Sequence, residues 1–269
     1  MTQEVQATFT LRQGTAPLLI SMPHVGTQLP EELKPAFSDV GLQVDDTDWH
    51  IGELYDFASE MGVSVIRPTY SRYAIDLNRP ADGQSLYPGQ NTTGLCPLTT
   101  FDNVPLYKPG MEPDAAETAR RLPIYWQPYH QALQAELERI KSIHGYALLW
   151  DAHSIRSLIP HLFEGELPVF NFGSASGESC TPGVAEGLLQ QAQQLAPHYP
   201  AVLNGRFKGG YITRNYGKPA QKVHAVQLEL AQRSYMEEQA PYALDAGLAG
   251  KLKPVLAALI KSYLAFKPA

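Results

Sequence analysis

Three apolar runs that each lead into polar residues constrain the fold of this chain most strongly. They span residues 16–24, 63–79 and 145–153, and helix-like patterns separate each run from the next. Continuous apolar runs of this length are typical of strands that helices cover on both faces of a sheet. Pro68 predicts a break within the second run, so we expect this run to form either one strand or two.

A fourth run, residues 222–230, alternates between polar and apolar positions. Gln227 and Glu229 fall on one side of a strand here, and apolar residues fall on the other. Pro254 is expected to kink or break the last helix, or to occupy its first turn. The alternation predicts an α/β fold, a mixed, mostly parallel sheet flanked by helices, as a single domain over residues 1–269. The helices are expected at residues 46–62, 113–144, 182–196 and 243–266.

The charge and cysteine content exclude several classes of protein. The 269 residues carry a formal net charge of −6, which argues against a nucleic-acid surface but allows a local cationic pocket. Cys96 and Cys180 lie far apart and form no CxxC pair, which favours a reducing compartment. The N-terminus lacks a signal-peptide pattern, and no apolar run approaches the roughly 20 residues of a membrane helix. We therefore expect a soluble, cytoplasmic protein with no nucleic-acid or membrane partner.

Polar residues gather where the predicted strands end, at residues 21–30, 75–79 and 150–154. Ligands of open α/β sheets bind at the carboxyl ends of the strands. His24 and His153 stand at two of these ends, and either one alone is explained by a hydrogen bond at a turn or strand end. Together they predict a metal site, because a hydrolytic Zn²⁺ is commonly held by two histidines and a carboxylate, with one position left for water.

The segment 45–50 offers the third metal ligand. Asp48 is the preferred ligand, because Asp46 is placed to cap the helix that follows. Asp46 remains the alternative carboxylate ligand, and Asp45 and His50 are the other candidates in this segment.

Glu229 is the remaining carboxylate of interest. An unpaired acid is costly to bury in an apolar strand, so Glu229 is either a solvent-facing residue of an edge strand or a functional group. As a functional group it would serve as the general base that takes a proton from water and returns it to a leaving amine.

Cations near the predicted strand ends indicate an anionic substrate with more than one carboxylate. Arginine forks hold carboxylates in a two-point geometry that lysine does not reproduce. Gly209 and Gly210 are able to expose backbone N–H groups. The segment 80–112 is long and rich in Gly, Pro, Asn and Thr, which is typical of a functional loop or lid. The candidate substrate-contacting residues are Arg72, Asn78, Arg79, Arg206 and Arg214.

These residues lie in motifs that resemble those of the N-formylglutamate amidohydrolases (deformylases). The motifs are SMPHVG, DDTDWHIGELYDFA, YSRYAIDLNRP, LLWDAHSIRS, LNGRFKGGYITRNYG and HAVQLELAQRSYMEE, and the resemblance covers residues 14–265. It implies hydrolysis of N-formyl-L-glutamate to formate and L-glutamate, the last step of a histidine-degradation route. It also implies a Zn²⁺ cofactor and a phosphorylase/hydrolase-like fold similar to those of zinc carboxypeptidases and aspartoacylases.

The resemblance also assigns roles by chain order. The related enzymes present a His, a nearby carboxylate, an Asn–Arg pair, a second His and a late Glu. This chain departs from them at Thr27, where the relatives place the carboxylate ligand close after the first His, so the ligand here must come from elsewhere. The corresponding residues of this chain are His24, Asp48, Asn78, Arg79, His153 and Glu229.

The remaining roles complete the expected mechanism. By the resemblance, Asn78 and Arg79 hold the substrate α-carboxylate, and Arg72 polarises the formyl oxygen or clamps a carboxylate. Asp151 is expected to orient His153 or to brace the strand end. Zinc is the expected metal, although the same ligands accept cobalt, manganese or iron.

Three alternatives stay open at this point. A serine hydrolase built on Ser154 lacks a GxSxG turn, and Ser154 adjoins His153, which is a poor arrangement for a nucleophile. A non-catalytic binder of acidic amino acids would keep the pocket without turnover. The third alternative is the same hydrolysis acting on another N-acyl amino acid, such as N-formylaspartate or N-formylglutamine. The residues leave the oligomeric state undetermined.

Overall fold

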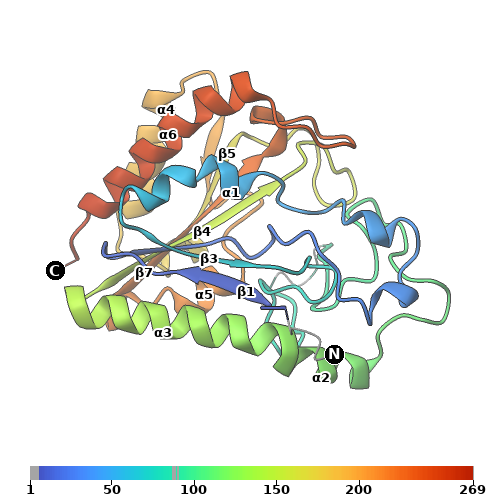
Figure 1. Cartoon of the computed structure of the whole chain (residues 1–269). Helices are drawn as coiled ribbons and strands as arrows, with labels where there is room; N and C mark the ends of the chain where they lie inside the picture. Colours follow the sequence, from blue (N-terminus) through green and yellow to red (C-terminus); the bar gives the residue numbers. More distant parts are fainter. Residues whose placement is uncertain (1–5, 87–88, 90, 269) are drawn as a thin grey trace.

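A mixed sheet of seven strands forms the centre of the fold in this computed structural model, which describes residues 6–86, 89 and 91–268. The strand order is β1-β3-β2-β4-β7-β5-β6 (Figure 1). β3, β2, β4 and β7 are parallel to one another, whereas β1 and β5 pair antiparallel with β3 and β7, and β6 is parallel to β5. The predicted α/β class and mixed sheet are confirmed. The bounds are β1 Phe9–Arg12, β2 Leu18–Ser21, β3 Ser64–Pro68, β4 Ala147–Ile155, β5 Phe170–Gly173, β6 Ala201–Leu203 and β7 Val223–Ala231.

The four strands that the sequence predicts are the four parallel strands. Every residue of β2, β4 and β7 is buried, as expected for strands covered on both faces. The second run yields a single strand, because β3 ends at Pro68 and the residues that follow form turns. β1, β5 and β6 were not predicted, because each has only three or four residues and, unlike the four-residue β2, none was identified within a long apolar run.

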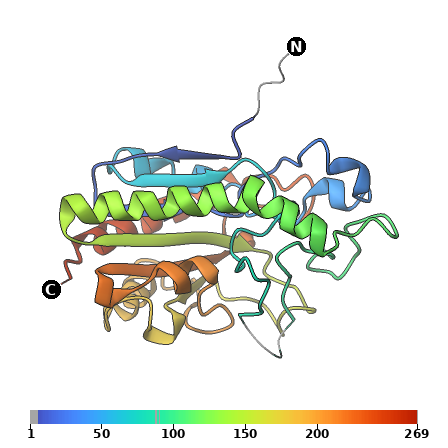
Figure 2. The ribbon, with the colours of Figure 1, turned by 90° about the horizontal axis from the view of Figure 1, so that it is seen from below.

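Helices cover both faces of this sheet and define two hydrophobic cores. α4 and α6 lie above the sheet in Figure 1 and α3 lies below it, and Figure 2 shows α3 running along the strands. The core under α1, α4 and α6 contains Trp150 and Leu228, and the core under α3 and α5 contains Leu149 and Ala225. The bounds are α1 Ile51–Leu54, α2 Ala115–Arg121, α3 Gln127–His144, α4 Val184–Leu195, α5 Tyr211–Tyr216 and α6 Ala246–Ala265.

The helix predicted over residues 46–62 is wrong in most of its length. Only α1 and a 3-10 turn, Asp56–Ser59, are helical there. Val44 and His50 adopt left-handed backbone conformations, with φ of 51° and 60°, so the residues between them form a loop. The predicted capping role of Asp46 is also wrong, because His50 precedes α1 and no side chain caps it.

The other predicted helices are confirmed, with two local differences. The region 113–144 is continuous, but a π-helix, Leu122–Trp126, joins α2 to α3. Pro254 lies inside α6, which runs from Ala246 to Ala265, so it neither breaks the helix nor stands in its first turn. In the described part of the chain, no helix combines the length and the apolar character needed to cross a membrane.

Candidate metal centre

The parallel strands deliver the candidate residues to one end of the sheet. His24 follows β2 directly, and His153 lies near the end of β4. Within the sheet, His153 of β4 is the register partner of Glu229 of β7. The carboxyl ends of parallel strands meet at one edge, and so segments far apart in the chain converge here.

Asp48 reaches the same place on a loop that is held at several points. Its backbone N–H donates to the carbonyl oxygen of His24 at 3.0 Å. Behind it, the Gln232 side chain donates to the carbonyl of Thr47 at 3.0 Å, and the Tyr235 hydroxyl donates to the carbonyl of Trp49 at 2.9 Å. The loop that presents Asp48 is therefore anchored to the segment that follows β7.

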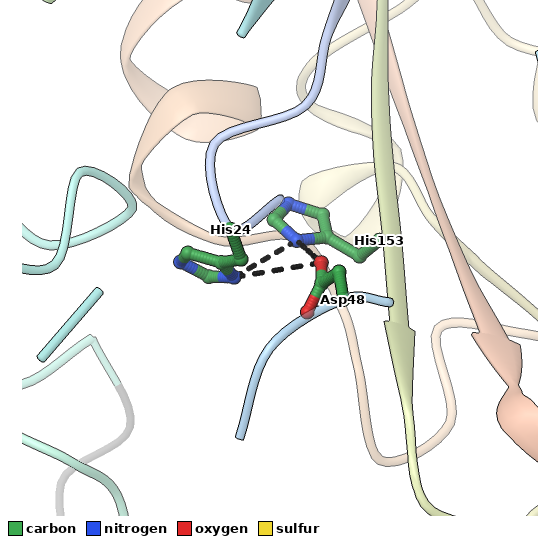
Figure 3. Close-up of side chains that lie close together, drawn as sticks. All are labelled: His24, Asp48 and His153. Carbon is green, nitrogen blue, oxygen red and sulfur yellow. Dashed lines mark hydrogen bonds and ion pairs between the residues drawn. The ribbon is translucent and has the colours of Figure 1, made fainter. Parts of the chain in front are cut away.

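His24, Asp48 and His153 converge on one point (Figure 3). The Nδ1 atoms of the two histidines are 3.2 Å apart, and Asp48 Oδ2 lies 3.1 Å from Nδ1 of His153 and 3.7 Å from Nδ1 of His24. Two ligand atoms on a tetrahedral Zn²⁺ with bonds of about 2 Å stand roughly 3.3 Å apart. All three side chains are buried. The donor set and its spacing thus fit a divalent metal ion.

A carboxylate lies behind each histidine, and the one behind His24 favours the tautomer that such a metal needs. Asp76 Oδ1 accepts from His24 Nε2 at 2.8 Å, and Asp151 Oδ1 lies 3.2 Å from His153 Nε2. A proton held on His24 Nε2 leaves the Nδ1 lone pair of that histidine directed at the shared point. Asp151 is fixed in turn by the Thr213 hydroxyl at 2.9 Å. Asp151 is therefore in contact with His153, as expected, whereas Asp76 was not predicted from the sequence.

Burial and neighbouring charges shift the pKa values of the groups in and behind the cluster in different directions. Burial opposes the ionised form of Asp76, but Arg72 and His24 outweigh it and hold the pKa of this carboxyl well below its usual range. Burial, together with Arg72, lowers the pKa of His24, which favours a neutral imidazole. Burial likewise disfavours the charged form of His153, yet Asp151 and Asp48 hold its pKa well above the ordinary value, because both carboxylates place negative charge beside it.

Glu229 stands beside the cluster in the interior of the sheet. It is buried, and β7 lies between β4 and β5, so the alternative of a solvent-facing edge residue is wrong. Burial raises the pKa of Glu229 to about 8. Gln227 donates to Glu229 Oε2 at 3.2 Å. The amide of Gln227 has a defined orientation, because its Oε1 accepts the backbone N–H of Gly210 at 2.7 Å.

Gln227 is a second site residue that the sequence analysis missed. Its position two residues before Glu229 on the same face of β7 is the signal that could have identified it. The contact with Gln227 also corrects the expectation that Gly210 exposes its N–H group to an anion.

Arg72 lies between the metal cluster and the pocket. Its Nη2 donates to Asp76 Oδ2 at 2.5 Å, and its Nη1 lies 3.4 Å from His24 Nδ1. The guanidinium also stacks over the ring of Phe101 at 4.9 Å. Arg72 is buried and lines the pocket, so its charge is directed at the space next to the two histidines.

The other predicted cations occupy different positions. Arg79 and Arg206 line the same pocket as His24 and Glu229, whereas Arg214 is not among its lining residues and donates its Nε to the carbonyl of Gly209 at 2.7 Å. Among the lining residues described in segment 80–112 are Asn91, Thr92, Thr93 and Phe101, so this segment forms one wall.

Asn78 lines the pocket with its amide in a fixed orientation. Its Oδ1 accepts the backbone N–H of Ile212 at 2.9 Å, and its Nδ2 lies 3.0 Å from His153 Nε2. Ser154 has different surroundings, because its Oγ is 2.7 Å from the Tyr235 hydroxyl and receives a hydrogen bond from Gln232. Those contacts give Ser154 no histidine partner among the described residues, which disfavours the serine hydrolase.

Fold and site together define an α/β protein with a His–Asp–His cluster at the carboxyl end of a parallel sheet, next to a buried glutamate and a pocket rich in arginine. Comparison with known proteins is consistent with this class. The family model of N-formylglutamate amidohydrolase matches residues 16–236. The chain belongs to the N-formylglutamate amidohydrolase family.

Two relatives and one solved structure illustrate the match. The chain is 53% identical over 257 residues to the N-formylglutamate deformylase of Pseudomonas aeruginosa, covering 96% of each chain. It is 52% identical over 257 residues to that of Pseudomonas putida, again covering 96% of each. The crystal structure of N-formylglutamate amidohydrolase from Ralstonia eutropha JMP134 superposes with a TM-score of 0.80 at 23% identity, over 96% of this chain and 98% of that one. This likeness confirms the fold.

Proposed function

We propose that this protein hydrolyses N-formyl-L-glutamate to formate and L-glutamate, the last step of a histidine-degradation route, with residues 1–269 acting as one catalytic domain in the cytoplasm. The observation that carries the proposal is the convergence of His24, Asp48 and His153 beside Glu229. The names of the two Pseudomonas relatives support the choice of substrate. The arginines of the pocket supply the positive charge that a small dicarboxylate requires.

The three clustered side chains are proposed to hold one divalent metal ion, with zinc as the first choice. Two imidazoles and a carboxylate are a ligand set of catalytic zinc sites, and cobalt, manganese and iron accept the same atoms. When bound, the ion would supply positive charge that acidifies a water molecule and stabilises negative charge on the formyl oxygen.

Glu229 is proposed to move the proton. Its side chain lies in the pocket beside the histidines, and burial holds its pKa close to neutral pH, where a general base and acid is most effective. It takes the proton from the attacking water and returns it to the departing amide nitrogen of glutamate. Gln227 holds Oε2 of this carboxylate in place during both transfers.

The pocket wall is proposed to hold the substrate. Asn78 and Arg79 bind the α-carboxylate, since the amide of Asn78 stands 3.0 Å from His153 and is thus next to the reacting group. Arg72 donates to the formyl oxygen as it becomes negatively charged, because its guanidinium is buried beside His24. Asp76 and Asp151 keep the two histidines in orientation.

Formate release from N-formyl-L-glutamate tests the proposal. The purified protein should release formate, should lose the activity on treatment with a chelator, and should recover it with one of the four metals. A His24→Gln variant should be inactive and should bind no metal, whereas His198→Gln, at an exposed histidine, should match the parent protein. Full activity after complete metal removal would contradict the metal proposal, and the absence of formate would contradict the reaction.

A further inference from the structure

We propose that Arg206 binds the side-chain carboxylate of the substrate and thereby selects glutamate, while Arg79 binds the α-carboxylate. This inference rests on the proposed function and assigns the two charges of the substrate to two different walls of its pocket. Both arginines line that pocket, together with His24, His153 and Glu229.

Arg79 belongs to the wall that is continuous with the metal cluster. Its Nη1 lies 3.9 Å from Asp76 Oδ2, and the other carboxylate oxygen of Asp76 binds His24. Its Nε and Nη2 donate to the carbonyl and hydroxyl oxygens of Thr93 at 2.8 and 3.0 Å. In an N-formyl amino acid the α-carboxylate is attached to the same carbon as the amide nitrogen. Of Arg79 and Arg206, Arg79 is the one that lies near a carboxylate bound to a histidine of the cluster, and the α-carboxylate is therefore assigned to Arg79.

Arg206 stands on a different segment, the loop that follows β6, although residues of the segment 91–93 hold both arginines. Its Nε donates to the carbonyl oxygen of Leu162 at 2.9 Å, and its Nη2 donates to the carbonyl oxygen of Asn91 at 3.1 Å. Both partners also line the pocket, and neither is part of the metal cluster. The glutamate side chain separates its carboxylate from the α-carbon by methylene groups, so this charge reaches a wall that lies away from the reacting bond.

The surface around Arg206 suits a short aliphatic chain that ends in a charge. Leu162, Phe207 and Ile155 line the same pocket and provide apolar contacts for methylene groups. The two carbonyl contacts hold the planar guanidinium of Arg206 before substrate arrives, which lowers the entropy cost of binding a carboxylate. A neutral side chain in this place forms no charge-assisted hydrogen bond with the guanidinium, and it should therefore bind less tightly than a carboxylate.

Kinetics with two isosteric substrates test the division of roles. N-formyl-L-glutamine has the shape of N-formyl-L-glutamate without the side-chain charge. We expect the parent protein to favour the glutamate substrate by about 100-fold in kcat/KM, because it alone forms the charge-assisted contact. Arg206→Gln should reduce this preference to within about threefold by losing rate on the glutamate substrate only. Arg79→Gln should slow both substrates by a similar factor and preserve the preference.

Lys208→Gln provides the matched control, because Lys208 lies in the same loop as Arg206 but is not among the residues lining the pocket. It should change neither rate nor preference. An Arg206→Gln protein that keeps the preference, or an Arg79→Gln protein that loses it, would overturn the assignment.

Calorimetric binding of L-glutamate and L-glutamine separates this inference from the proposed function, because it requires no turnover. The parent protein should bind L-glutamate more tightly, and Arg206→Gln should bind the two alike. If the protein released no formate but showed this binding pattern, the reaction would be wrong and the role of Arg206 right. Equal binding of both amino acids by the parent protein would refute the role of Arg206.

Discussion

The metal cluster and the distal wall of the pocket, formed by Arg206, Leu162 and Phe207, are held in place by different kinds of structure. His24, His153 and Glu229 stand on or shortly after strands whose own residues are all buried, and the contacts behind them come from buried carboxylates and amides. Arg206 stands on a loop, and backbone carbonyls of two other loops hold it. Rigid strands suit groups that must converge on one ion. Loops vary more easily in sequence, and they suit residues that recognise the side chain of the substrate.

Removal of the proposed proton carrier should give the largest effect. Glu229→Gln keeps the size and burial of the side chain but cannot accept a proton, so kcat should fall by about 1,000-fold. KM and metal content should stay close to those of the parent protein, which steady-state kinetics and metal analysis measure. A residual rate above about one tenth of normal would remove Glu229 from the mechanism.

Asp46 connects the loop that carries Asp48 to segment 80–112, and its burial predicts a pH-dependent stability. Its Oδ2 accepts from the Tyr73 hydroxyl and from the backbone N–H of Phe101, both at 2.8 Å, and so joins the Asp48 loop to segment 80–112. Burial raises the pKa of Asp46 from 3.8 to about 6. The folded state therefore holds this proton more tightly than the unfolded state, and the stability that protonation provides is lost as the pH rises from about 4 through 6.

The corresponding variant makes this measurable. Asp46→Asn cannot ionise, so its free energy of unfolding relative to the parent protein should increase by about 2 kcal/mol between pH 4 and pH 7. Denaturant melts of both proteins across this range test the prediction, with exposed Asp39→Asn as the control. A difference that stays constant with pH would show that Asp46 does not titrate in this way.

Asp76 should matter for metal affinity more than for substrate binding. Asp76→Asn weakens the acceptor behind His24 and also the ion pair with Arg72, and metal affinity should fall by about 10- to 100-fold. Competition with a chromogenic chelator gives the affinity without any need for catalysis. Unchanged affinity would mean that His24 is oriented by its own loop rather than by Asp76.

Arg214 should show the smallest effect. The sequence places it near other cations, but it does not line the pocket, and its Nε binds the carbonyl of Gly209. Arg214→Gln should therefore leave kcat/KM for N-formyl-L-glutamate within about twofold. A loss comparable to that of Arg206→Gln would extend the distal wall to include Arg214.

The comparison also explains which features are visible in the sequence. The strands that lead to His24 and carry His153 and Glu229 lie in long, mostly apolar runs, so the polar residues near their ends stand out, and the convergence of the ends follows from a parallel sheet. Asp48 lies in the cluster with His24 and His153 even though the helix expected around it is wrong, and its role as a metal ligand stays a prediction. Val44 and His50 adopt left-handed backbone conformations that shape that loop, and such conformations are not predicted from a valine or a histidine in a sequence.

Features that depend on tertiary contacts were not predictable in the same way. Asp76 contacts His24, and Gln227 contacts Gly210, and in both pairs the partner lies far away in the chain. The difference between Arg206 and Arg214 likewise depends on which loop carbonyls receive each guanidinium. β5 and β6 are too short to leave a pattern.

The most direct test of the central claim is a crystal structure of the zinc-loaded protein with anomalous data collected at the zinc edge. We predict a single strong peak per chain, at about 2.1 Å from His24 Nδ1, His153 Nδ1 and Asp48 Oδ2, with Glu229 facing the open side of the ion. A peak elsewhere, or no peak in a protein that is fully active, would contradict the account.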